Sequence, residues 1–120
     1  MARPDSNVRP VQADAEFVVE CRLPDASFAA ALALSVRREV ARRAGVAPEA
    51  VYAADRLPEE WSDVFYLDAV EFVMELEEQF GVSIPDRATA VFGRERVTVA
   101  DLAAEMTRGA VAGRRPWRWW

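Results

Sequence analysis

The sequence predicts an all-α protein, a small four-helix bundle with a short N-terminal flank. Two observations lead to this prediction: apolar residues recur every three or four positions in several long stretches, and glycine or proline closes these stretches. The chain has 120 residues, of which 52% are hydrophobic, so it fits one domain with a modest core. We expect a flank over residues 1–24, the bundle over 25–108 and an Arg/Trp-rich tail over 109–120.

The flank and the first helix differ in their patterns. The flank contains three prolines and one compact apolar stretch, Phe17-Val18-Val19, for which we expect a short extended segment. The first helix should begin near Asp25 or Ser27, either of which can cap it, and end at Ala44 before Gly45. Its buried stripe has a spacing of four residues, and three arginines lie away from it: the stripe is Phe28, Leu32, Val36 and Val40, and the arginines are Arg37, Arg38 and Arg42.

Two further helices follow a long connection. The second helix should end at Gly81 and Pro85, and residues 86–91 should form a short helical turn. The last helix is expected from Val99 to about Arg108, because Thr98-Val-Ala-Asp101 resembles a capping box. Leu102 and Met106, four residues apart, should face the core.

The composition excludes several kinds of chemistry. The chain has no histidine, no lysine and one cysteine, Cys21, which excludes a Cys/His zinc site, a Cys-His or Ser-His catalytic pair and a Schiff-base lysine. We therefore expect no enzyme and no metal. One cysteine forms no internal disulfide, and no signal or membrane-spanning stretch is visible, so we expect a cytoplasmic location.

Negative charge is concentrated in one part of the chain. The net charge is -5, but nine acidic residues and only Arg56 as a basic residue lie between Asp55 and Glu78, which gives that segment a charge of -8. Such a field repels nucleic acid and attracts basic protein surfaces. We expect a protein partner and no nucleic acid.

The second helix resembles that of acyl carrier proteins. The run Glu71-Phe72-Val73-Met74-Glu75-Leu76-Glu77-Glu78 is similar to that family's Glu-Leu-Val-Met-x-Leu-Glu-Glu, and Ile84-Pro85-Asp86 follows at the matching distance. The resemblance covers about residues 28–106 and implies the family's helical bundle. In that family the helix opens with Asp-Ser-Leu, and the serine carries a 4'-phosphopantetheine arm.

In this chain the position of the modified serine holds Tyr66, in the sequence Phe65-Tyr66-Leu67. A phenol is larger and differently placed from a serine oxygen, so the resemblance predicts no cofactor. Ser62 is the alternative attachment site, and its simpler role is that of a helix N-cap. Rings at Trp61, Phe65 and Tyr66 would hinder an arm.

The second helix divides into three sectors at 100° per residue. One side is apolar and should face the core, the second is a narrower apolar stripe, and the third is acidic; the stripe is Leu67, Val70 and Met74, and the acidic residues are Asp68, Glu71, Glu75 and Glu78. The resemblance implies that residues here meet basic, apolar grooves on partner enzymes: Leu67, Asp68, Val70, Glu71 and Met74, with Glu77 and Glu78 adding charge. Burial of the stripe beneath the flank or the tail is the alternative interpretation.

The tail combines arginine with Trp117, Trp119 and Trp120, which suits weak contact with a membrane surface or folding back onto the acidic helix. The leading hypothesis is a non-catalytic, acyl-carrier-protein-like domain that acts unmodified as a docking or regulatory partner of a larger enzyme or assembly. The alternatives are a genuine carrier modified at Ser62, in fatty-acid or polyketide-type biosynthesis, and a membrane-surface adaptor that uses the tail.

Overall fold

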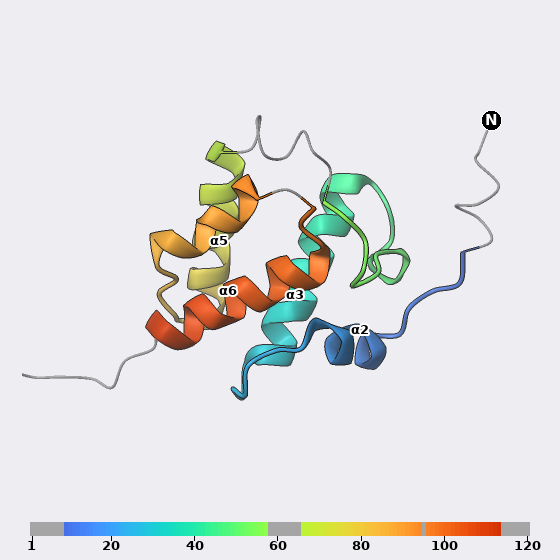
Figure 1. Ribbon diagram of the computed structural model, residues 1–120, viewed down its shortest axis with the longest axis horizontal. Helices are drawn as coiled ribbons and strands as arrows, with labels where there is room; N and C mark the ends of the chain where they lie inside the picture. Colours follow the sequence, from blue (N-terminus) through green and yellow to red (C-terminus); the bar gives the residue numbers. More distant parts are fainter. Residues whose placement is uncertain (1–8, 58–65, 95, 114–120) are drawn as a thin grey trace, which may run out of the picture.

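The architecture is all-α, as predicted. The computed structural model describes residues 9–57, 66–94 and 96–113, and for residues 66–69, 89 and 93 it describes the backbone only. The elements follow in the order α2 (Asp14–Cys21), α3 (Ala29–Ala44), the 3-10 helix η1 (Pro48–Ala50), α5 (Tyr66–Phe80), the 3-10 helix η2 (Asp86–Gly93) and α6 (Val99–Gly113). Figure 1 shows α6 crossing α3, with α5 and η2 at one end of the molecule and α2 at the other.

The core lies between α3 and α6. Leu32, Val36 and Val40 of the predicted stripe are buried, whereas Phe28 is only partly buried. Leu102 and Met106 are buried on the facing side of α6, as the four-residue spacing predicts. Burial of these side chains is the main stabilising contribution to the bundle.

Both ends of α3 test the sequence prediction. Its C-terminus is as expected, because Gly45 has a φ of 72° and its N–H donates to the carbonyls of Ala41 and Arg42. The predicted start was wrong: the helix begins at Ala29 after Phe28 as N-cap, so neither Asp25 nor Ser27 caps it.

The N-terminal segment is helical, and the predicted extended segment around Phe17 was wrong. In α2, Phe17 and Cys21 lie four residues apart and both are buried in the core. Asp14 and Glu16 lie in the first turn, where negative charge stabilises a helix. The period of 3.6 residues, set by Phe17 and Cys21, prevails over the strand preference of the two valines between them.

The connection after η1 runs alongside the start of α6. Leu57 N–H donates to the Val97 carbonyl at 2.8 Å, and Val99 N–H donates to the Asp55 carbonyl at 2.8 Å. Arg56 and Thr98 form an isolated antiparallel bridge. These bonds hold residues 55–57 against residues 97–99, at the start of α6.

The last helix has the predicted cap and extends beyond the predicted end. Thr98 N–H donates to the Asp101 carboxylate and Asp101 N–H donates to the Thr98 hydroxyl, each at 3.0 Å, which is a reciprocal capping box. The helix continues five residues past Arg108 to Gly113, where a Cβ atom would overlap the Ser83 carbonyl oxygen. The end of α6 therefore lies against the chain that follows α5.

Candidate functional site

The exposed side of α5 carries the features that the sequence singled out. Met74 is 59% exposed and Val70, one turn earlier, is 39% exposed. Phe72, Val73 and Leu76 are buried on the opposite side of the helix. Glu71, Glu75 and Glu78 are exposed. The described part of α5 therefore presents two neighbouring apolar side chains among three carboxylates, and we call Val70, Glu71, Met74, Glu75 and Glu78 the α5 face.

One edge of the α5 face lies beside α3. Gln79 donates a hydrogen bond to the Ser35 hydroxyl at 3.1 Å. Glu39 of α3 accepts hydrogen bonds from Arg42 and Arg43. Arg42 also has a weaker electrostatic attraction to Glu75 of α5. Burial on its own would raise the pKa of Glu39, but the two arginines outweigh burial and hold that pKa below its usual value.

The other edge of the α5 face lies beside the chain reversal after the helix. Glu77 accepts a hydrogen bond from the Ile84 backbone N–H at 2.8 Å, and Val82 N–H donates to the Glu77 carbonyl at 3.2 Å. Ile84 itself is buried. Glu77, predicted to steer a partner, therefore has a contact within the fold that the sequence did not predict.

Several residues named from the sequence lie outside the described side chains. Tyr66 is the first residue of α5, and the backbone alone is described from there through residue 69, a stretch that includes Leu67 and Asp68. The alternative attachment site Ser62 falls outside the described residues, as do Trp61 and Phe65 and the tail residues Trp117, Trp119 and Trp120.

A buried polar network at the other end of the molecule was missed by the sequence analysis. Arg37 of α3 is 1% exposed. Its guanidinium donates to the carbonyl oxygens of Gln12 at 2.6 Å and Val51 at 3.0 Å, and to the Asp14 carboxylate at 2.9 Å. It also lies 4.6 Å from the centre of the Phe17 ring. Arg37 thus joins α3, the N-terminal segment and the residues around η1.

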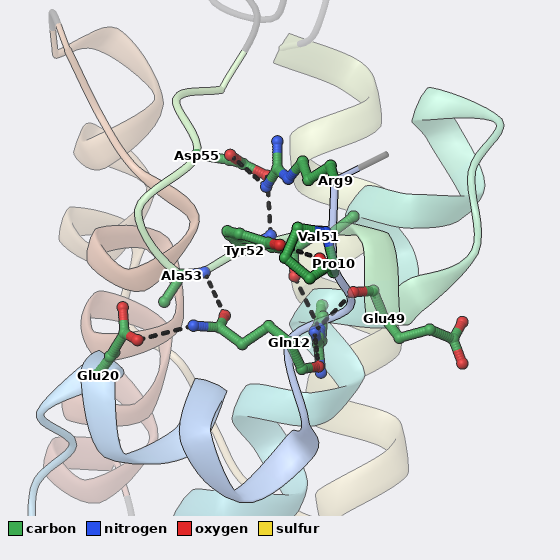
Figure 2. A network of polar contacts seen from close by, with 10 residues as sticks. Arg9, Pro10, Gln12, Glu20, Glu49, Val51, Tyr52, Ala53 and Asp55 are labelled. Atoms are coloured by element: carbon green, nitrogen blue, oxygen red, sulfur yellow. Dashed lines mark hydrogen bonds and ion pairs between the residues drawn. The ribbon is translucent and has the colours of Figure 1, made fainter. Parts of the chain in front are cut away.

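Gln12 extends this network, as Figure 2 shows. Its side-chain carbonyl accepts from Ala53 N–H at 2.9 Å, and its amide group donates to Glu20 at 2.7 Å. Its backbone N–H donates to the Glu49 carbonyl at 3.0 Å. Among the described residues, no buried side-chain nitrogen or oxygen lacks a hydrogen-bond partner. The network is therefore a satisfied structural connection and offers no free group for chemistry.

A more exposed ion pair completes the attachment of the N-terminal segment. Arg9 contacts both oxygens of Asp55, at 2.7 and 2.6 Å, and its guanidinium lies 3.5 Å from the centre of the Tyr52 ring. The hydrogen bond to Asp55 raises the pKa of Arg9. The Tyr52 hydroxyl donates to the Pro10 carbonyl (Figure 2). The N-terminal segment is thus held at the loop after η1.

Neither a metal-binding group nor a reactive thiol is present among the described residues. They contain no group of His, Cys, Asp or Glu side chains that could hold a metal ion. Cys21 is buried, and its removal from water, with a smaller effect of Glu20, raises the pKa of its thiol to about 11, so it is a poor nucleophile. In the same residues, no helix combines the length and apolarity required to traverse a lipid bilayer.

Comparison with known proteins gives no relative: no family model, no curated protein and no solved structure matches the chain. The function must therefore be inferred from the residues of the chain itself.

Proposed function

We propose that the protein is a non-catalytic domain of the acyl-carrier-protein type, a small four-helix bundle that acts unmodified as a docking or regulatory partner of a larger enzyme or assembly. The contact is made by the α5 face. The observation that carries the proposal is the exposure of Met74, one helical turn after the exposed Val70 and among three exposed glutamates. Contiguous apolar area on a monomer's surface commonly marks an interaction site.

The chemistry of the α5 face defines its partner. Complete burial of a methionine side chain contributes about 1.5 to 3 kcal/mol, so Met74 and Val70 provide affinity only if a partner encloses them. Glu71, Glu75 and Glu78 favour a basic surface and accelerate its approach. The partner is therefore a protein with an apolar groove bordered by arginine or lysine. The family resemblance adds Leu67 and Asp68 to the proposed contact residues.

The start of α5 supports action without a prosthetic group. The described part of α5 begins with Tyr66, which stands at the position where the family resemblance would place the modified serine. A tyrosine there provides no aliphatic hydroxyl for attachment of the arm. The bundle keeps its docking helix and loses the attachment point.

Quantitative capture of a partner tests the docking proposal. Tagged full-length protein is incubated with an extract of the native host, and each captured protein is compared between the native chain, Met74→Ala, the double variant Glu71→Lys/Glu78→Lys and the control Glu16→Lys. Glu16 is an exposed acidic residue of α2, and Figure 1 shows α2 and α5 at opposite ends of the molecule. The expected partner is lost with the first two variants and retained with the control.

Salt dependence provides a second criterion. Raising the ionic strength from 0.1 M to 1 M shortens the Debye length from about 10 Å to about 3 Å, so a charge-steered association must weaken. The proposal would be contradicted if the amount of every captured protein stayed the same in the α5 variants and at high salt.

Intact mass decides whether the protein is modified. The full chain is incubated with coenzyme A and a phosphopantetheinyl transferase, and the expected result is an unchanged mass. A gain of one phosphopantetheine group that Ser62→Ala abolishes would instead establish the carrier alternative.

A further inference from the structure

Gly113, the last described residue of α6, lies close to one edge of the α5 face. Gly113 packs so closely on Ser83 that a Cβ atom there would overlap the Ser83 carbonyl oxygen. Ser83 precedes Ile84, whose N–H is bound by Glu77 of α5. Residues 114–120 therefore start from a point beside the edge of α5 that carries Glu77.

From this edge the apolar part of the α5 face is adjacent. Met74 lies three residues before Glu77, and Val70 lies four residues before Met74, so successive side chains are neighbours on the helix surface. Val70 lies seven positions before Glu77, which corresponds to about 11 Å along the helix axis. Seven extended residues span up to about 25 Å, so residues 114–120 are long enough to cover this distance.

The chemistry of the two segments is complementary. Residues 114–120 contain three arginines and three tryptophans: Arg114, Arg115, Arg118, Trp117, Trp119 and Trp120. The α5 face offers exposed Met74 and Val70 for the rings, and three carboxylates for the arginines. Thioether sulfur contacts aromatic rings favourably, and carboxylates bind guanidinium groups with paired hydrogen bonds.

We propose that residues 114–120 of the same chain occupy the α5 face, with a tryptophan on Met74 and the arginines on Glu71 and Glu78. In the free protein the tail then covers the surface that a partner needs. The regulatory part of this inference rests on the proposed function, whereas the occupancy of the α5 face is a property of the isolated protein. If the tail covers the face in nine molecules of ten, the apparent Kd for a partner rises about tenfold.

Methyl NMR of methionine tests the occupancy in the full-length chain. The chain has three methionines, and among the described residues Met74 is exposed while Met106 is buried, so Met106 serves as the internal reference. A tryptophan ring on Met74 shifts its methyl resonance upfield. The triple variant Trp117→Ala/Trp119→Ala/Trp120→Ala should remove that shift and leave Met106 unchanged.

Charge variants and concentration make the test specific. The double variant Glu71→Gln/Glu78→Gln should reduce the Met74 shift, and the control Glu16→Gln/Asp25→Gln, at exposed acidic positions outside α5, should retain it. The shift should not depend on protein concentration. A shift that grows with concentration would assign the contact to a second copy of the chain and overturn the proposal.

The proposal would also be overturned if the chemical shift of the Met74 methyl group were the same with and without the tryptophan substitutions. If tryptophan-dependent sedimentation with anionic phospholipid vesicles accompanied that result, the tail would belong to a lipid surface. The capture experiment tests the proposed function separately from the occupancy of the α5 face by the tail. If the proposed function is wrong, Met74→Ala does not reduce capture of any partner, whatever the NMR result for the tail. If both inferences are correct, the triple tryptophan variant captures more partner than the native chain.

Discussion

Replacing Arg37 with alanine should lower the free energy of unfolding by about 3 to 5 kcal/mol, because it leaves buried backbone carbonyls without their hydrogen-bond donor. Arg37 is buried and donates to two buried backbone carbonyls, those of Gln12 and Val51, and at 3.4 Å to the partly exposed carbonyl of Glu49. Alanine removes these donors and leaves space that it cannot fill. The substitution therefore acts on three segments of the chain at once.

The magnitude follows from the individual contacts. A buried carbonyl that loses its donor costs about 1 to 3 kcal/mol, so the two carbonyls together account for about 2 to 6 kcal/mol. The ion pair with Asp14 adds little, because that carboxylate is 70% exposed and exposed pairs contribute about 0 to 1 kcal/mol. The contact with the Phe17 ring adds about 0.5 to 2 kcal/mol. Together these contributions amount to roughly 2.5 to 9 kcal/mol, and water that enters the vacated space and hydrates the freed carbonyls lowers the expected cost to about 3 to 5 kcal/mol.

Urea unfolding followed by far-UV circular dichroism measures the effect, since a domain of this size commonly unfolds in one transition. Three variants accompany Arg37→Ala. Arg38→Ala removes the exposed neighbour and should cost less than about 1 kcal/mol, as should Asp14→Asn. Arg37→Lys keeps the charge but not the planar donor group, so it should have an intermediate cost and remains measurable if the alanine variant does not fold.

Equal costs for Arg37→Ala and Arg38→Ala would refute the reasoning, as would a cost for Asp14→Asn that matches that of Arg37→Ala. Either result would mean that the buried carbonyl contacts do not contribute as calculated.

Three other substitutions probe separate features of the fold. The lowered pKa of Glu39 means that its carboxylate stabilises the fold above pH 4.5 and that this contribution is lost as the pH falls through the pKa of the folded state, so Glu39→Gln should cost up to about 1 kcal/mol at pH 7 and progressively less in acid in urea titrations. Asp101→Ala removes one half of the capping box and should cost about 1 kcal/mol, seen as a drop of several degrees in Tm. Gly113→Ala places a methyl group against the Ser83 carbonyl and should cost about 1 to 3 kcal/mol, while Ala112→Ser, at the exposed position beside it, should be nearly neutral in the same melting experiment.

The elements with strong local signals could be predicted from the sequence. The Gly45 terminus of α3 and the capping box at Thr98 each rest on a few adjacent residues, and both are present in the structure. On α5 the apolar sector with Phe72 and Leu76 is buried, because a 15-residue helix repeats its pattern often enough to define a face.

The N-terminal helix could not be predicted with the same approach. The eight residues of α2 complete little more than two turns, so Phe17 and Cys21 give a single repeat that adjacent valines conceal. Helices this short are stable only through tertiary contacts. The partner surface for α2, formed by α3 and α6, comes from distant parts of the chain.

Arg37 was misjudged for a related reason. Arginines in an amphipathic helix are usually exposed, and Arg37 lies beside the predicted stripe together with two others that are exposed. The available signal was the small size of the neighbours one turn away, Ala33 and Ala41, which are both buried and leave room for a long side chain. Most acceptors around the guanidinium are backbone carbonyls, and every residue type has one, so the sequence gives no sign of which carbonyls will surround Arg37.

The enclosure of Cys21 has a practical consequence for biophysical work. Cys21 is the last residue of α2, is buried in the core, and is the only cysteine of the chain. A cysteine placed at the exposed Val19 or at Met74 would therefore react with a maleimide dye in the native state ahead of the original residue. Fluorophores can thus be attached at either end of the molecule without first removing the natural thiol from the core.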